Sequence, residues 1–247
     1  MTICIISKNY CFQTGLVRRT VVHYLRVNTD AHLFMETTLR TSDLGPAYRI
    51  ETPRLVLRCW NPGDAPDLRS LLDKSDQHLR PHIPFMKHEP RSLEQTIQWL
   101  REIRASFDLD QHYRYGVFKK DGNELIGEIM FIDREGSGQR EMGYWLGKEF
   151  CGKGFITEAA SAMTQVGLLI DKAQRVEIHC DEQNIASAKI PDSIGFTHDA
   201  TLRSRAHRSD STLGNLMIWS MFPDQLESST ASEVRYKAWN SAGEEIM

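Results

Sequence analysis

The sequence predicts an α+β fold built on a mixed, mostly antiparallel sheet flanked by helices. Two kinds of pattern support this class: short runs of β-forming residues bounded by turn residues, and longer runs with apolar residues at helical spacing. Their order along the chain is strand, two helices, three strands, helix, strand, helix and two strands. This order indicates one α+β domain.

The size and composition are those of an ordinary globular protein. At 247 residues, with 40 % hydrophobic and 26 % charged residues, the chain is long enough for one sizeable core. A net charge of −3 gives no reason to expect a nucleic acid or an anionic membrane as partner. No apolar run approaches the roughly 20 residues of a transmembrane helix. The five cysteines are scattered without a Cys-x-x-Cys pair, which favours a reduced, cytoplasmic setting and suggests no metal site.

Residues 1–50 differ from the rest of the chain. Their first apolar run is short and no charged region leads it, which argues against a secretory signal. No acidic residue precedes Asp30 although several arginines do, so an organelle transit peptide stays open as an alternative. A third interpretation places the natural start at Met35. We expect a poorly ordered extension, followed by a domain at 51–222 and a polar tail at 223–247.

The domain opens with a strand at 51–58 and a turn in which Asp64 is a plausible cap for a short helix to about Leu72. Three prolines predict a loop around 81–86. Ser92 caps the clearest helix, whose apolar stripe we attribute to core packing; the stripe consists of Leu93, Ile97, Leu100, Ile103 and Phe107.

The second half of the domain supplies most of the sheet. Strands at 113–119 and 124–132 are joined by Asp121-Gly122, a good hairpin signal. Further strands are expected at 141–146, 175–180, 197–203 and 213–221. A helix capped by Asn184 ends at Gly195, which stands in the helix-stop position. After Pro223 the pattern fades into a tail that we expect to be flexible, apart from a short element near 234–239.

A glycine-punctuated turn, Cys151-Gly152-Lys153-Gly154, joins the strand at 141–146 to the helix that begins near Ile156. Glycines allow backbone N–H groups to point inward, and a helix start adds partial positive charge, so the turn suits a phosphate group. Lys153 would add a full charge. The alternative is a plain tight turn, because the spacing matches neither the dinucleotide-binding glycine pattern nor the Gly-Lys-Ser/Thr phosphate loop.

With its flanks included, this stretch resembles the acyl-CoA signature of the GNAT superfamily of N-acetyltransferases. The most similar branch is the RimJ/RimL type, the ribosomal-protein N-terminal acetyltransferases. The resemblance covers roughly residues 51–222 and implies a GNAT-like three-layer fold with acetyl-CoA as co-substrate and no metal. The matching residues are Gly143-Tyr144-Trp145-Leu146, Gly152-Lys153-Gly154 and Thr157-Glu158-Ala159.

The resemblance also implies where the cofactor lies. In the family, the strand equivalent to 141–146 parts from its neighbour, and its backbone pairs with the pantetheine arm. The pyrophosphate then rests on N–H groups of the turn, and a backbone N–H near Met142 or Gly143 stabilises the oxyanion. The expected cofactor-binding residues are Met142, Tyr144, Trp145, Leu146, Cys151, Gly152, Lys153, Gly154, Phe155, Ile156, Thr157 and Asn184.

Two residues depart from the family pattern. Cys151 stands where relatives usually carry Gln or Arg, and Ile156 stands where they carry Gly or Ala, which narrows the space near the pyrophosphate. Binding through backbone groups should survive both changes. Because the sequence places no histidine near Cys151 and the family transfers directly, we interpret Cys151 as a simple thiol rather than a nucleophile.

A second segment, from Asn184 through Ser187 to Gly195-Phe196, resembles the family as well. Many GNAT enzymes protonate the leaving thiolate with a tyrosine, but the matching position here is Pro191, which closes that route. In the RimL-type branch the serine matching Ser187 takes this role, with Asn184 one helical turn before it. The alternative is structural, because Asn is a good helix cap and Ser is common in first turns.

The general base is the least defined part. The glutamate that RimL-type enzymes place after the Gly-Phe pair has no equivalent at 204–208, which leaves His207, Glu141 and Glu128 as candidates. An α-amine with a pKa of about 7.7–8 costs roughly 1 kcal/mol to deprotonate at pH 7, and a lysine costs roughly 4–5 kcal/mol. A chain without an obvious base therefore fits an α-amine better.

The expected function is acetyl-CoA-dependent N-acetylation by direct transfer to a primary amine, either a protein N-terminus or a small molecule. Two alternatives remain: a non-catalytic acyl-CoA-binding or sensor domain of the same fold, and a phosphate-binding α/β protein of another fold. We expect a cytoplasmic monomer or homodimer with no nucleic-acid or membrane partner. The histidines at 78, 82 and 88 are not expected to share a metal.

Overall fold

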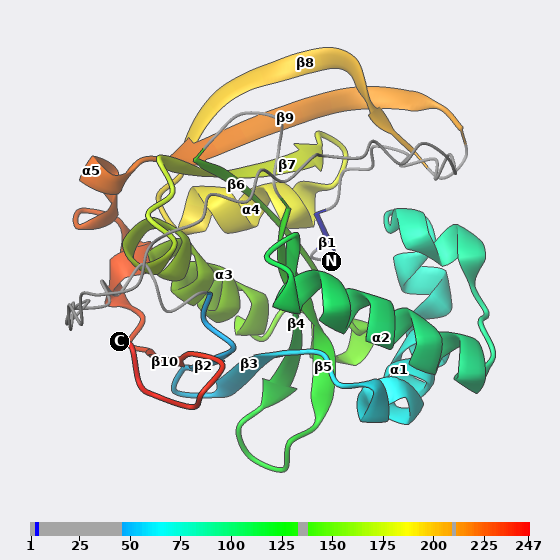
Figure 1. Ribbon diagram of the computed structural model, residues 1–247. Helices are drawn as coiled ribbons and strands as arrows, with labels where there is room; N and C mark the ends of the chain where they lie inside the picture. Colours follow the sequence, from blue (N-terminus) through cyan, green and yellow to red (C-terminus); the bar gives the residue numbers. More distant parts are fainter. Residues whose placement is uncertain (1–2, 5–45, 133–137, 209–210) are drawn as a thin grey trace, which may run out of the picture.

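The computed structural model describes residues 3–4, 46–132, 138–208 and 211–247. Within these residues the strands form one ten-stranded sheet in the order β10-β2-β3-β4-β5-β6-β7-β9-β8, and β1 pairs with β6 off this path. All neighbouring pairs are antiparallel except β6 with β7, which are parallel. The predicted α+β class with a mixed, mostly antiparallel sheet is therefore confirmed (Figure 1).

The first predicted strand is a hairpin of two strands. β2 (Arg49–Glu51) and β3 (Leu55–Cys59) pair antiparallel around the turn at 52–54. Two helices follow: α1 (Ala65–Leu79), preceded by the 3-10 turn η2 (Pro62–Asp64), and α2 (Leu93–Asp108), preceded by η3 (Pro84–His88). Asp64 does not cap α1 with its side chain, because both carboxylate oxygens bind Arg58 at 2.7 and 2.8 Å.

Helix α2 begins as predicted but buries less of its stripe. Ser92 accepts from the N–H of Gln95, and the Gln95 side chain accepts from the N–H of Ser92, which forms a capping box. Its buried apolar residues are Leu100, Ile103 and Phe107. Leu93 and Ile97 remain 43 % and 36 % exposed, so the attribution of the whole stripe to core packing is wrong for the first turns.

The sheet centre follows the predicted order. β4 (His112–Lys119) and β5 (Leu125–Ile132) form the hairpin, and β6 (Gln139–Leu146) leads through the 3-10 turn η4 (Lys148–Phe150) to α3 (Phe155–Gln165). The helix continues as a π-turn, η5 (Val166–Ile170), before β7 (Arg175–Asp181). α4 (Ile185–Ser193), β8 (Thr197–His207) and β9 (Leu213–Met221) complete the domain, with Gly195 at φ 91° after α4.

The segment after Pro223 is not the flexible tail that the sequence predicts, although the short element expected near 234–239 is present. It forms α5 (Pro223–Leu226), the 3-10 turn η6 (Thr230–Glu233) and β10 (Lys237–Trp239), and β10 pairs with β2. Ala231 and Ala238 are fully buried. The prediction for residues 1–50 falls mostly outside the described residues; of residues 1–45 only β1 (Ile3–Cys4) is described.

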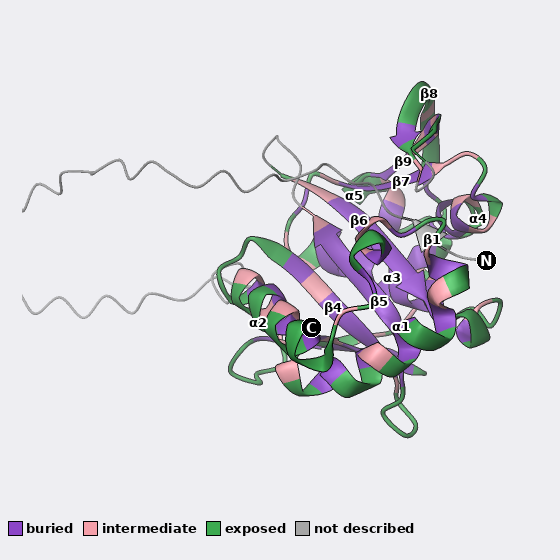
Figure 2. Ribbon diagram, turned by 90° about the vertical axis from the view of Figure 1, so that its right-hand side faces the viewer, coloured by how far each residue is buried: buried purple, intermediate pink, exposed green. Residues whose placement is uncertain are grey.

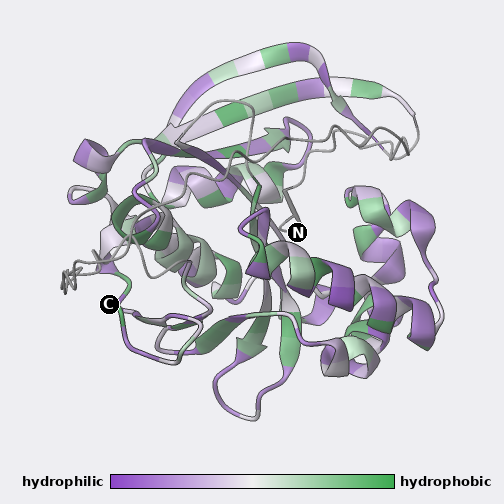
Figure 3. Ribbon diagram, viewed as in Figure 1, coloured by the Kyte–Doolittle hydropathy of each residue, from purple (hydrophilic) through white to green (hydrophobic). Residues whose placement is uncertain are grey.

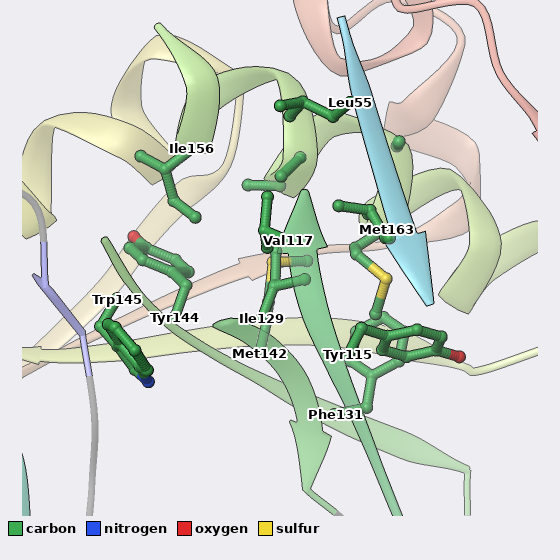
Figure 4. Close-up of a cluster of buried hydrophobic side chains, with 14 of the residues drawn as sticks. Leu55, Tyr115, Val117, Ile129, Phe131, Met142, Tyr144, Trp145, Ile156 and Met163 are labelled. Atoms are coloured by element: carbon green, nitrogen blue, oxygen red, sulfur yellow. The ribbon is translucent and has the colours of Figure 1, made fainter. Parts of the chain in front are cut away.

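The two faces of the sheet differ in chemistry. Paired residues on neighbouring strands share a face, so Met142, Tyr144 and Ile178 lie on one side, called here the Tyr144 face. α3 packs on it, and Figure 4 shows Met163 over Tyr115 and Ile156 toward Tyr144. The opposite side, the Glu141 face, carries Glu128, Glu141, Trp145 and Glu177. Buried strands therefore run between an apolar layer and a layer with several charged groups.

Burial follows this arrangement. Figure 2 shows the central strands largely buried, whereas the edge strand β8 is mostly exposed and stands away from the domain. Figure 3 shows hydrophilic segments along the outer sides of α1 and α2. Among the described helices, none is both long and apolar enough to cross a membrane.

Candidate active site

The strands β6 and β7 separate in the middle of the sheet. Their parallel pairing runs from Gln139 with Arg175 to Met142 with Ile178 and stops there, although β6 continues to Leu146 and β7 to Asp181. Beyond this fork the two facing backbones are not paired with each other. An open strand edge inside a sheet can pair with an extended ligand.

The β6 side of the fork does accept an added strand. β1 pairs antiparallel with it, Ile3 with Trp145 and Cys4 with Tyr144. The backbone groups of these two predicted cofactor-binding residues are therefore positioned for an extended segment. A pantetheine arm, with its two amides, presents the same kind of donors and acceptors.

The predicted phosphate turn lies on the exposed surface before α3. Gly152 and Gly154 have φ angles of 75° and 74°, a left-handed conformation that other residues rarely adopt. Among the described residues, the N–H groups from Gly152 to Thr157 donate to no backbone or side-chain oxygen. This row of unpaired donors at a helix N-terminus fits a phosphate group. A cavity of about 580 Å³ beside it is lined by residues that include Arg54, Gly154 and Thr157.

A buried carboxylate fixes this turn to the start of the sheet. Glu158 accepts from Thr52 Oγ1 at 2.6 Å and from the N–H and Nε of Arg54 at 2.9 and 2.5 Å. Arg54 Nη1 also donates to the carbonyl oxygen of Lys153 at 3.1 Å. The guanidinium lies 4.8 Å from the ring centre of Phe155. Sequence reasoning named Glu158 only as part of a motif and missed Arg54, because their contact joins residues more than 100 positions apart.

Cys151 has a histidine beside it, contrary to the sequence interpretation. His78 Nε2 of α1 lies 3.5 Å from Cys151 Sγ, and the thiol also lies 3.5 Å from the carbonyl oxygen of Gly147. His78 is 5 % exposed, and burial lowers the pKa of its imidazole. The two residues are 73 positions apart, so no local pattern announces the pair. Ile156 is buried against Tyr144, so its side chain points into the core rather than toward the open turn (Figure 4).

Helix α4 brings Ser187 under the fork. Asn184 Oδ1 accepts from the N–H of Ser187 at 3.2 Å, which is the helix cap expected from sequence. Tyr144 Oη donates to the carbonyl oxygen of Ser187 at 3.3 Å and so links α4 to β6. The Ser187 hydroxyl is fully buried and has no hydrogen-bond partner within the described structure. A buried hydroxyl in this state costs about 1–3 kcal/mol, and such a cost is often kept for function.

The three candidate bases occupy different surroundings. Glu128 is 1 % exposed and accepts from Trp60 Nε1, Trp145 Nε1 and the Arg114 guanidinium, all within 2.9 Å. Glu141 is buried on the Glu141 face, paired across the strands with Glu177. His207 is exposed at the end of β8, where it is paired with Leu213 of β9. The structure therefore brings together Asn184, Ser187 and Tyr144, and leaves His207 apart from them.

The loop at 81–86 approaches β6. Phe85 in η3 packs between Trp99 and Trp145, with ring centres 5.2 and 6.1 Å apart. Arg91 and Arg114 each lie over the Trp99 ring, at 4.3 and 5.2 Å. The loop therefore packs beside the fork and is not a remote connector.

The residues that the structure describes were compared with the arrangement that a metal ion needs. No group of three His, Cys, Asp or Glu side chains in the described ranges is arranged to hold a metal ion. Of the three histidines at 78, 82 and 88, His78 lies in α1 and interacts electrostatically with His82, and His88 ends η3.

Comparison with known proteins places the chain in a family. The model of the acetyltransferase (GNAT) domain matches residues 54–197. The chain is 34 % identical over 95 residues to the uncharacterized N-acetyltransferase p20 of Bacillus licheniformis, an alignment that covers 38 % of this chain and about half, 53 %, of that protein. It is 26 % identical over 161 residues to the uncharacterized N-acetyltransferase YoaA of Bacillus subtilis, covering 65 % and 89 % of the two chains.

Solved structures share the fold. The RimL ribosomal L7/L12 α-N-protein acetyltransferase, in complex with coenzyme A, superposes with a TM-score of 0.64 at 20 % identity, over 70 % of this chain and 97 % of that one. The predicted GNAT-like architecture is confirmed by this similarity. The family match covers more than half of the sequence and includes the fork, the turn and all of α4. The chain belongs to the GNAT acetyltransferase family.

Proposed function

We propose that the protein transfers an acetyl group from acetyl-CoA directly to a primary amine, and that the acceptor is an α-amino group. The observation that carries the proposal is the fork between β6 and β7, which opens beside the unpaired N–H groups at the start of α3. Pantetheine would take the place of β1 along Tyr144 and Trp145, and the pyrophosphate would meet the turn at 152–156. These groups fit the cofactor without a metal.

Once the cofactor is bound, acetyl transfer involves three events. The amine nitrogen attacks the thioester carbonyl, the developing oxyanion is stabilised, and the C–S bond breaks as sulfur leaves with the electron pair. A backbone N–H near Met142 or Gly143, where the strand pairing ends, is positioned to serve the oxyanion. The Ser187 hydroxyl would gain the partner it lacks by donating to the departing thiolate.

The acceptor is argued from the cost of deprotonation. A free α-amine is available at pH 7 for roughly 1 kcal/mol, whereas a lysine side chain needs roughly 4–5 kcal/mol. Glu128 is held by an arginine and two indole N–H groups, so both of its oxygens already accept hydrogen bonds from buried or part-buried donors. An α-amine therefore fits a site without a strong base. One fold relative, RimL, is described as acting on the α-amine of a ribosomal protein.

The test pairs cofactor binding with turnover. Thermal unfolding is measured with and without acetyl-CoA, and thiol release is followed over a panel of peptide N-termini, amino acids and lysine analogues. We expect stabilisation by roughly 2.7 kcal/mol at about 100 times Kd and release that depends on α-amines. Stabilisation without release from any amine would favour the non-catalytic acyl-CoA-binding alternative, and no stabilisation would overturn the cofactor assignment.

A serine variant tests the proposed acid. Ser187→Ala should keep the acetyl-CoA thermal shift and lower kcat by about 10²-fold, because general acid catalysis contributes roughly 10²–10⁴-fold. Ser193→Ala, at the exposed end of the same helix, is the control and should leave kcat unchanged. Unchanged kcat in Ser187→Ala with intact cofactor binding would remove Ser187 from the mechanism.

A further inference from the structure

The β6 edge of the fork is occupied by another segment of this chain. β1 pairs antiparallel with it, so that Ile3 lies opposite Trp145 and Cys4 opposite Tyr144. On its other edge β6 pairs with β5 along the same two residues. β7 pairs with β6 only as far as Met142, so beyond that residue β1, and not β7, is the neighbour of β6 in the fork. β1 also contacts β7 and α4, and Figure 1 shows it beside β6 and α4.

β1 and a pantetheine arm need the same backbone groups. The N–H and C=O groups of a strand alternate between its two edges, and β5 bonds the groups of β6 that point toward it. Only one row of groups at Tyr144 and Trp145 therefore points into the fork. A backbone donor in that row cannot bond β1 and the cofactor together. The two occupants of the edge exclude each other.

β1 matches the arm of the cofactor but not its two ends. The Ser187 hydroxyl has no hydrogen-bond partner within the described structure, although β1 contacts the helix that carries it. The N–H groups at the start of α3 likewise gain no acceptor from β1. β1 thus takes the pantetheine position and gives no partner at the positions expected for the thioester and the phosphates. With two paired residues it makes few bonds, so its docking is weak and reversible.

The covalent link makes this contact intramolecular. Residues 5–45 join β1 to the domain that it contacts. A tethered competitor acts at a fixed effective concentration, which does not change with the concentration of the protein. It raises the apparent Kd of a ligand to the intrinsic Kd divided by the fraction of molecules in which the site is open.

We propose that residues 3–4 are an intramolecular competitor of acetyl-CoA, which pairs with the β6 edge until the cofactor displaces it. This inference rests on the proposed function, because it needs the pantetheine arm at the same edge. Binding of acetyl-CoA then releases β1. By the same linkage, a partner that captures the released segment, or a protease that removes it, increases the affinity for acetyl-CoA.

The test changes the backbone of β1 in the full chain and leaves the domain unaltered. Proline has no N–H group, so Ile3→Pro/Cys4→Pro removes both donors of β1. Ile3→Ala/Cys4→Ala keeps both donors and is the matched control. In isothermal titration with acetyl-CoA, the proline variant should bind about fivefold more tightly than wild type, which corresponds to a segment docked about four-fifths of the time. The alanine control should bind as wild type.

Hydrogen exchange of the wild type gives a second measurement, whose direction is distinctive. A bound ligand ordinarily slows amide exchange in the segments that it contacts, because it opposes their local opening. Acetyl-CoA should slow exchange in the first turn of α3 and accelerate it in a peptide that contains residues 3 and 4, since β1 then loses its pairing with β6. Unchanged or slower exchange at residues 3 and 4 would contradict the displacement.

The outcomes separate this proposal from the proposed function. No binding of acetyl-CoA by either the wild type or the proline variant would overturn the cofactor assignment itself. Equal affinities of these two proteins would overturn only the competition by β1. Equal tightening in the alanine control would overturn the backbone pairing as its cause. An affinity that falls as the protein concentration rises would place β1 in the fork of a second copy and contradict an intramolecular competitor.

Discussion

At the scale of single residues, the buried charges of the Glu141 face differ in the hydrogen-bond partners that hold them. Glu128 accepts hydrogen bonds from donors of three other segments, namely Trp60, Arg114 and Trp145. Such a carboxylate stabilises the fold only together with its partners. Removing one group of the set leaves another group buried and unpaired. Glu177 and His179, by contrast, form a small pair at the fork.

The structural role of Glu128 is testable by removing it. Glu128→Ala should lower the free energy of unfolding by about 3–5 kcal/mol, since it leaves a buried guanidinium and two indole N–H groups without an acceptor. The measurement is denaturant unfolding. Glu124→Ala, on the same hairpin, is the control: its ion pair with Lys119 is exposed, and the loss should stay below about 1 kcal/mol. A stable Glu128→Ala protein without activity would instead place Glu128 in the chemistry.

At the scale of elements, the start of α3 is held in place by residues outside the glycine turn. Glu158 bonds to Thr52 and Arg54, so the β2–β3 turn braces the helix from which the N–H groups point outward. The glycines allow the turn's shape, and the Glu158–Arg54 contact fixes its position against the sheet. Both are needed for a preorganised phosphate site.

The brace should matter for the cofactor as well as for stability. Glu158→Ala should weaken acetyl-CoA binding by roughly tenfold, about 1.4 kcal/mol, because the turn must then be ordered by the ligand itself. Isothermal titration measures the affinity. Glu149→Ala, an exposed residue of the neighbouring η4, is the matched control and should bind as wild type. Equal affinities for the two variants would show that the turn keeps its shape without the brace.

Local patterns predicted the elements better than they predicted the contacts between elements. The helix cap at Ser92, the Asp121-Gly122 hairpin and the stop at Gly195 depend on neighbours within a few residues, and all are present. The Cys151–His78 contact and the Glu158–Arg54 contact join distant segments, and no sequence period encodes them. The exposure of Leu93 and Ile97 has the same origin, because the helical period does not say where the sheet ends.

At the scale of the whole molecule, the C-terminal segment after Pro223 contacts both the sheet and the helices α3 and α4. β10 extends the sheet beside β2. Gln165 of α3 donates to the carbonyl oxygens of Ala231 and Val234, both at 2.8 Å, and Thr230 donates to Ser193 of α4 at 2.7 Å. These contacts were missed because the segment is largely polar in sequence, and its only buried apolar residues are Leu226, Ala231 and Ala238.

Removing this segment should therefore destabilise the domain. A chain that ends at Phe222 loses the β10 pairing and leaves the buried amide of Gln165 without its two acceptors. We expect a melting temperature lower by roughly 10 °C than that of the full chain, and a weaker response to acetyl-CoA. Equal melting temperatures would mean that the segment is dispensable. Gln165→Leu in the full chain is a milder companion, since it replaces the amide by an apolar side chain.

The position of β10 also affects the tendency of the protein to aggregate. β2 is three residues long and carries the buried Ile50, and without β10 its outer backbone groups would form an open edge. Open edges of this kind template the addition of strands from other molecules, which begins aggregation. The last strand thus protects solubility as well as shape, and light scattering during partial unfolding should rise as β10 detaches.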